Sequence, residues 1–176
     1  KNYILYPIRA IRRKNIGEAI LLSLCFKNSA TLVITLPPNS PPDIKRYEDW
    51  KTFVIENDLN VIVEAGLTHE FSDLVLSSDF LITTSITEGF GFSFLEPWTA
   101  EKYLWGRKLP DICQDFEQNS IRLDHLYTRL DVPMSWVDND MLFYTWKSGM
   151  QKVSAMFGKT IDDIFIKTAY EKATTN

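Results

Sequence analysis

Several residue types that mark particular classes of protein are scarce in this sequence. Its 176 residues include only two histidines and two cysteines. That is too little for a histidine-rich metal site, and Cys25 and Cys113 stand far apart without metal-ligand spacing. They fit incidental thiols of a reduced protein, although a disulfide between them stays open. The longest apolar runs, such as those at 20–22 and 80–82, are far shorter than a membrane span.

Positive charge is also not in excess. Lysine and arginine number 19 against 23 acidic residues, which gives a formal net charge of −4. A general nucleic-acid binder is normally basic, so we expect no nucleic-acid partner. The hydrophobic share of 45% and the charged share of 24% are ordinary for a globular protein. No secretory-signal pattern opens the chain, and we expect a cytoplasmic protein.

The length fits one ordinary domain of 176 residues. The chain begins at Lys1 rather than at methionine, and it enters an apolar strand almost at once. We therefore expect residues 1–176 to form a single domain excised from a longer protein.

Short β-like runs alternate with longer helical patterns along most of the chain. Apolar and β-branched runs predict strands, and apolar residues at helical spacing predict the helices between them. The prolines between Pro37 and Pro42 predict a surface loop. The expected strands are 3–6 (ended by Pro7), 31–36, 61–65, 80–84 and 103–105, and helices are expected to begin at Asn15, Asp43, Thr68 and about Phe94.

The last third of the chain has helical spacing throughout. Apolar residues share a helical face at 121, 126, 127 and 130 and again at 142, 146, 150, 153 and 157, and a final helix is expected at about 161–173. Strands buried on both faces and alternating with helices predict an α/β fold. The expected architecture is a doubly wound parallel sheet with a helical C-terminal third. Ligands bind such sheets beyond the carboxyl ends of the strands, which are here the loops after Tyr6, Ala65 and Thr84.

A basic loop follows the first expected strand. It contains Arg9, Arg12, Arg13 and Lys14 and leads into a helix whose predicted N-cap is Asn15, with Glu18 at the spacing of a capping box. Cationic side chains beside the free N–H groups of a helix start suit a phosphate. A solvated basic turn is the simpler alternative.

A glycine-containing turn follows the fourth expected strand. Gly89 and Gly91 allow the backbone to approach a ligand closely, and Glu88 and Glu96 bracket the turn with carboxylates that suit sugar hydroxyls. Simpler alternatives are that Ser93 and Glu96 form a capping box and that Glu88 is an exposed loop acid.

Taken together, these segments resemble a known family. Arg9 and Lys14 form R-x4-K, and Glu88 and Glu96 form E-x7-E in the run EGFGFSFLE. Both motifs in a β/α domain are similar to the C-terminal, donor-binding half of GT-B glycosyltransferases. The resemblance extends from Tyr3 to about Lys102 and is strongest to the retaining family four, which includes glycogen and sucrose synthases.

The resemblance implies a role for each matching residue in binding a nucleotide-diphosphate sugar. Arg9 and Lys14 would hold the diphosphate and stabilise the leaving group, and Glu88 would contact the transferred hexose. The resemblance implies that no metal or other cofactor is needed. The remaining implied contacts are backbone N–H groups of Gly89, Phe90, Gly91 and Phe92 to sugar and phosphate, Glu96 to the ribose, and the loop at Gly66 and Leu67 to the nucleobase.

The resemblance also implies a partner domain. The acceptor-binding half, which precedes the donor half in this fold, is expected to lie outside residues 1–176, so this fragment would bind donor weakly and catalyse little. Relatives that act on lipid acceptors associate with membranes through that half. The family's glycine pair after the fifth strand is missing here, where the sequence reads WGRKLPDIC. A non-catalytic binding or regulatory module, a GT-B nucleotide-sugar epimerase and an unrelated nucleotide-binding protein therefore stay open.

Overall fold

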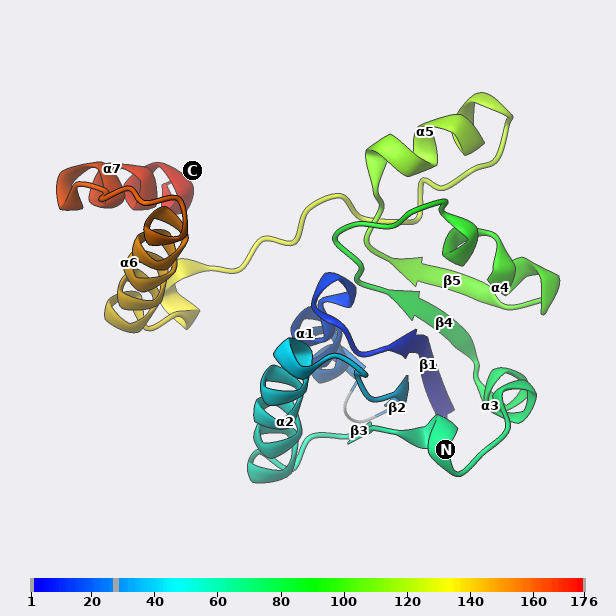
Figure 1. Ribbon diagram of the computed structural model, residues 1–176. Helices are drawn as coiled ribbons and strands as arrows, with labels where there is room; N and C mark the ends of the chain where they lie inside the picture. The colour runs from blue at the N-terminus through cyan, green and yellow to red at the C-terminus, as the bar shows by residue number, and fades with distance from the viewer. Residues whose placement is uncertain (1, 27–28, 176) are drawn as a thin grey trace. The chain divides into compact units, whose positions relative to one another are not determined.

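The computed structural model describes residues 2–26 and 29–175. Contacts between residues divide the chain into two compact units, 1–129 and 130–176. The first unit contains a sheet and the second is helical (Figure 1). Each unit is described by itself.

The first unit is built on a sheet of five parallel strands in the order β3-β2-β1-β4-β5. The strand order changes direction between β1 and β4, because the chain first adds β2 and β3 on one side and later adds β4 and β5 on the other. The carboxyl ends of these two strands therefore flank the crevice in which such folds bind ligands. The strands are β1 (Asn2–Arg9), β2 (Ala30–Leu36), β3 (Val61–Ile62), β4 (Phe80–Thr83) and β5 (Tyr103–Gly106).

Helices cover both faces of this sheet, so the expected doubly wound parallel fold is confirmed (Figure 1). One core includes Ile4 and Ile34 and lies against α1 (Ile16–Phe26) and α2 (Pro41–Glu56). The other includes Leu5 and Leu81 and lies against α3 (Phe71–Ser77) and α5 (Pro110–Gln118). Alternate residues of β1 thus enter opposite cores, as strand geometry requires. Shorter elements are α4 (Glu96–Thr99) and the 3₁₀ turns η1 (Arg12–Lys14), η2 (Ala65–Leu67) and η3 (Phe92–Phe94).

The first strand does not end at Pro7 as predicted but continues to Arg9. Its pairing with β4 covers only Ile4 and Leu5, and its register with β2 shifts between Tyr6 and Arg9. Pro7 therefore lies where β1 has left β4 and is irregularly paired with β2. Because Pro7 has no backbone N–H, it would interrupt a regular ladder of strand hydrogen bonds, but no such ladder is present at this position.

Two helix starts also differ from the prediction. Pro41 and Pro42 are the first two residues of α2, after Ser40, instead of belonging to the loop. Proline is favoured at this position because its N–H would have no helical partner. Thr68 does not begin a helix, because the chain first forms η2 and α3 starts only at Phe71.

The helix expected around 121–130 is wrong. Helix α5 precedes this segment, and Leu123 and Leu126 are buried in the second core without helical structure around them. The backbone instead pairs with the end of β5: Tyr127 N donates to Gly106 O at 2.9 Å, and Lys108 N donates to Tyr127 O at 2.7 Å. Burial and pairing with β5 thus replace the internal bonds of a helix.

The second unit confirms the helices expected near the end of the chain. They are α6 (Asn139–Met156) and α7 (Asp163–Thr174), preceded by the 3₁₀ turn η4 (Met134–Trp136). Asp138 caps α6 by accepting from Met141 N at 2.9 Å, and Asp162 caps α7 by accepting from Ile164 N at 2.6 Å. In the part of the chain that the structure describes, none of the helices combines the length and apolar character needed to cross a bilayer.

Candidate functional site at the carboxyl ends of β1 and β4

The loops that follow β1 and β4 meet at the switch point of the sheet. The basic loop follows β1 as η1, and the loop that contains Glu88 follows β4. The loops are joined by a backbone hydrogen bond from Ile86 N to Arg13 O at 2.9 Å. Cations and a carboxylate are thereby placed where doubly wound sheets bind ligands.

The centre of the site is an ion-paired carboxylate. Glu88 accepts from Lys14 Nζ through Oε1 and from Arg13 Nη1 through Oε2, although Lys14 lies 74 residues earlier in the chain. The Glu88 side chain is 8% exposed and that of Lys14 is 12% exposed. Burial of the carboxyl raises its pKa, but hydrogen bonds from Lys14, Ser85 and Arg13 outweigh burial and the pKa lies below its ordinary value. The carboxylate is thus held ionised, and it fixes two cations at the edge of the sheet.

A buried hydroxyl network fixes the backbone that carries Lys14. Tyr6 donates from its hydroxyl to Lys14 O at 2.6 Å, and the same hydroxyl accepts from Thr84 N at 3.1 Å. Thr84 Oγ1 contacts Lys14 O at 3.1 Å and Asn15 O at 3.0 Å, and Ser85 Oγ lies 3.2 Å from the Tyr6 hydroxyl. Burial raises the pKa of Tyr6, so the phenol stays protonated. The sequence prediction did not include these residues; polar Thr84 and Ser85 at the end of a buried strand were the available signal.

The capping box expected from Asn15 and Glu18 is not formed. Asn15 has a left-handed backbone with φ of 49°, and its side-chain Nδ2 donates to Glu18 Oε2 at 2.9 Å. The Glu18 carboxylate mainly accepts hydrogen bonds from Arg107, with Nε at 2.9 Å and Nη2 at 2.6 Å. It also accepts from the Tyr127 hydroxyl at 2.6 Å. Hydrogen bonding to Glu18 raises the pKa of Arg107. The bidentate pair of Arg107 and Glu18 connects the end of β5 to the start of α1 and so stabilises the basic loop that precedes α1.

The Arg9 side chain does not contact the Glu88 carboxylate in this structure. Its side chain is exposed and donates from Nη1 to Pro37 O at 2.9 Å, in the loop after β2. Arg13, one residue before Lys14, is the arginine that contacts Glu88. The R-x4-K spacing therefore does not by itself identify the guanidinium nearest to Lys14.

The glycines of the second motif differ in what they do. Gly91 has a φ of 74°, and a Cβ there would lie 2.3 Å from Ile112 Cγ2 of α5, so only glycine fits. A Cβ on Gly89 would meet nothing within 4 Å. Between and after them, Phe90 and Phe92 are 82% and 63% exposed and stack on each other at 6.1 Å. The turn thus presents two aromatic rings to solvent beside Glu88.

Glu96 does not cap its helix through a box with Ser93. It is the exposed first residue of the four-residue α4, and Ser93 Oγ is buried with no hydrogen-bond partner in the described part of the chain. The last two predicted residues lie in η2. Gly66 packs closely, since a Cβ would be 3.1 Å from Thr35 O, and Leu67 is exposed.

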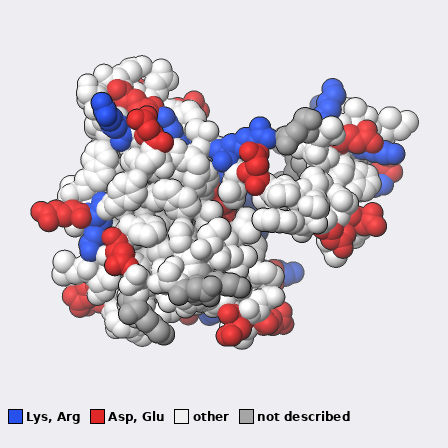
Figure 2. All heavy atoms as spheres, turned by 180° about the vertical axis from the view of Figure 1, so that it is seen from behind, with Lys and Arg blue, Asp and Glu red and all other residues white. Residues whose placement is uncertain are grey.

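The residues that the structure describes hold no cluster of three histidine, cysteine or acidic side chains that could bind a metal ion. Acidic and basic side chains are interspersed on a largely uncharged surface in the view of Figure 2. Together the fold and the site define a doubly wound protein with cations and a carboxylate at its switch point, an arrangement suited to phosphorylated ligands.

Comparison with known proteins specifies this class further. No protein-family model matches the sequence. The chain is 37% identical over 135 residues to the mannosylglucosyl-3-phosphoglycerate synthase of Petrotoga mobilis, a match that covers 75% of this chain and 26% of that protein. The chain therefore spans about a quarter of the length of this curated relative.

Among solved structures, TarM shares the fold of this chain. TarM superposes with a TM-score of 0.53 at 18% identity over 65% of this chain and 23% of its own. The C-terminal domain of the group 1 glycosyl transferase LpcC from Francisella tularensis gives a TM-score of 0.49 at 20% identity, over 60% of this chain and 57% of its own. The expected resemblance to GT-B glycosyltransferases is confirmed: the chain has the fold of their Rossmann-like C-terminal domain.

Proposed function

We propose that this chain is the nucleotide-sugar-binding domain of a retaining hexosyltransferase. The observation that carries the proposal is the meeting of Lys14, Arg13 and Glu88 at the carboxyl ends of β1 and β4. It brings together one half of each sequence motif at the position where the fold binds ligands. The fold shared with glycosyltransferases supports the same assignment.

The cations would bind the donor's diphosphate. Lys14 is largely buried and Arg13 is half-exposed, so a phosphate would meet one shielded ammonium and one accessible guanidinium. When the bond between the sugar's anomeric carbon and the diphosphate breaks, negative charge grows on the departing oxygen. Fixed cations stabilise that charge without a metal ion. Arg9 would join them if the loop after β2, which it contacts through Pro37, rearranges around the ligand.

The carboxylates would bind hydroxyl groups. Glu88 has accepted two charged donors in this structure, and an ionised carboxylate has further lone pairs for hydroxyls of the hexose. Glu96 is exposed and free of the predicted capping bond, so it can accept from a ribose. The acceptor hydroxyl would attack the anomeric carbon from the face that the diphosphate leaves and pass its proton to the departing phosphate oxygen, which retains the anomeric configuration.

The whole reaction would need a second domain that binds the acceptor. The curated relative is nearly four times as long as the segment that it shares with this chain, which leaves room for one. That relative is named for a product that joins mannosyl and glucosyl groups to 3-phosphoglycerate. We propose an acceptor of the same class, a sugar derivative that carries a phosphate or carboxylate.

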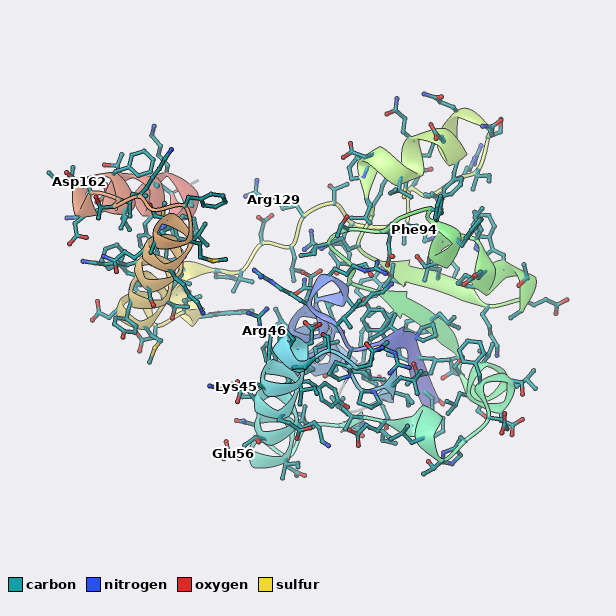
Figure 3. All side chains as sticks on the ribbon, viewed as in Figure 1. Lys45, Arg46, Glu56, Phe94, Arg129 and Asp162 are labelled. Carbon is teal, nitrogen blue, oxygen red and sulfur yellow. The ribbon has the colours of Figure 1, made fainter. Side chains whose placement is uncertain are left out.

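Sugar transfer by the full-length parent tests this function. Glu88→Gln and Glu96→Gln remove one carboxylate each, and Glu56→Gln is a matched control at the far end of α2 (Figure 3). A lost charge-assisted hydrogen bond of about 1.5–3 kcal/mol predicts a decrease in kcat/KM of about 10- to 150-fold. The control should be unchanged. Full transfer activity in both site variants would refute the assignment, and donor binding without any transfer in the wild type would favour the regulatory alternative.

A further inference from the structure

A cavity in the first unit lies beside the basic loop and is separate from the Glu88 site. Its volume is about 440 Å³, within the range of roughly 300–1,000 Å³ typical of small-molecule pockets. It opens between η1 with the first turn of α1 on one side and α2 on the other. Neither Lys14 nor Glu88 lines it.

Hydrogen bonds and close packing fix the two walls of this cavity. Asp43 of α2 accepts from Arg12 N at 3.0 Å, which ties η1 to the start of α2. Trp50 lies so close to Gly17 that a Cβ there would be 2.4 Å from Trp50 Cζ2. Phe53 packs edge-to-face on Trp50, with ring centroids 5.8 Å apart at 89°. The glycine thus lets an aromatic wall form directly against the first turn of α1.

Two arginines line the same cavity. Arg12 and Arg46 both line it, and neither side chain has a hydrogen-bond or ion-pair partner among residues 2–26 and 29–175. The cavity also contains Asn15 and Asp49, whose side chains can accept from hydroxyls. Free guanidinium groups favour carboxylate or phosphate, and aromatic rings favour the apolar face of a ring-shaped ligand.

We infer that this cavity binds a sugar carrying a phosphate or carboxylate group. The aromatic wall of Trp50 and Phe53 would contact the sugar ring, and Arg46 with Arg12 would bind the anionic group. A nucleotide presents the same combination of a ring and a phosphate, so the experiment must separate the two sources. The inference goes beyond the donor site proposed above and does not depend on it, although an acceptor of the proposed class would fit this cavity.

Calorimetric titration of the chain with glucose 1-phosphate, 3-phosphoglycerate, glucose and a nucleoside diphosphate tests the inference. We expect saturable binding of glucose 1-phosphate, weaker binding of 3-phosphoglycerate and none of glucose. Arg46→Ala should weaken glucose 1-phosphate binding at least tenfold, as expected for a lost charge-assisted contact. Lys45→Ala is the matched control, because Lys45 is the preceding residue of α2, is exposed and does not line the cavity (Figure 3).

Competition identifies which source occupies the cavity. We expect the nucleoside diphosphate neither to displace glucose 1-phosphate nor to lose affinity in Arg46→Ala. Displacement would overturn the inference, because the cavity would then be part of a nucleotide site. Equal losses in Arg46→Ala and Lys45→Ala, or no saturable binding of either phosphorylated probe, would overturn it as well. Loss of nucleotide binding in Lys14→Ala bears on the proposed donor site alone, so the two proposals fail separately.

Discussion

Removing the hydroxyl of Tyr6 should destabilise the first unit and loosen the Lys14 loop. The change is Tyr6→Phe, which keeps the ring that packs in the core. The hydroxyl donates to Lys14 O at 2.6 Å and accepts from Thr84 N at 3.1 Å. Lys14 O retains a second donor, Thr84 Oγ1 at 3.1 Å, but Thr84 N has no other hydrogen-bond acceptor than the Tyr6 hydroxyl among the residues that the structure describes.

The magnitude follows from the buried group left without a partner. Thr84 is fully buried, so its unpaired N–H cannot form a hydrogen bond with water instead. Such a group costs about 1–3 kcal/mol, and the lost bond to Lys14 O adds less because that carbonyl keeps one donor. We therefore expect a decrease of about 2 kcal/mol in the free energy of unfolding. With a typical dependence on urea of about 2 kcal/mol per molar, the unfolding midpoint should fall by about 1 M.

Urea denaturation measures this change, and Tyr3→Phe is the matched control. Tyr3 lies in the same strand, is only half-buried, and its hydroxyl has no partner among the residues described here. Its loss should change the free energy of unfolding by less than about 0.5 kcal/mol. Equal midpoints for Tyr6→Phe and Tyr3→Phe would refute the reasoning that the buried network holds the loop.

Three further perturbations have directions fixed by the structure. Glu18→Ala leaves Arg107 without its bidentate partner at a largely buried position, and urea denaturation should show a loss of about 2–3 kcal/mol; an unchanged midpoint would contradict this. Gly106→Ala places a Cβ 1.9 Å from a backbone oxygen of β4 at φ of 133°, so the unfolding temperature should fall by several degrees, whereas Gly89→Ala has open space and should not lower it. The pKa of Glu88 is lowered in the fold, so its charge stabilises the protein above its ordinary pKa of 4.5, and this stabilisation is lost as the pH falls through the lower folded value. The difference in unfolding free energy between the wild type and Glu88→Gln should therefore shrink below pH 4.5, and a difference that grew there would contradict the assigned direction.

Local patterns were sufficient to predict the sheet and the two loops that carry the candidate site. The β-branched run from Thr31 to Leu36 forms β2 because such residues pack well on a surface buried on both sides. Parallel strands put their carboxyl ends at one edge, and the loops after the first and fourth strands meet because β1 and β4 are neighbours in the sheet. That geometry brought Lys14 and Glu88 together, as the motif positions indicated.

Local patterns failed where a distant partner decides the conformation. Glu18 has the spacing of a capping residue, yet Arg107, 89 positions away, takes its carboxylate. Arg13 in η1 rather than Arg9 contacts Glu88, and Arg9 donates instead to Pro37 O in the loop after β2. Neither contact can be predicted from sequence spacing. The first depends on Arg107 at the end of β5, and the second depends on the loops after β2 and β4.

The spacing of the apolar residues in 121–130 also fits a helix, although this segment is not helical. Leu123 and Leu126 are buried in the second core, although the segment that contains them is irregular. The backbone hydrogen bonds that a helix would supply come instead from Gly106 and Lys108. Apolar spacing reports burial here and not the local conformation.

A calorimetric titration of the chain with a panel of nucleoside diphosphates and their sugars, repeated with Lys14→Ala and Lys45→Ala, tests directly whether the chain has a donor site. We expect saturable binding of one nucleotide, an affinity at least tenfold lower in Lys14→Ala and an unchanged affinity in Lys45→Ala. Such a result would also identify the base. Binding that survives Lys14→Ala unchanged would contradict a donor site at the carboxyl ends of β1 and β4.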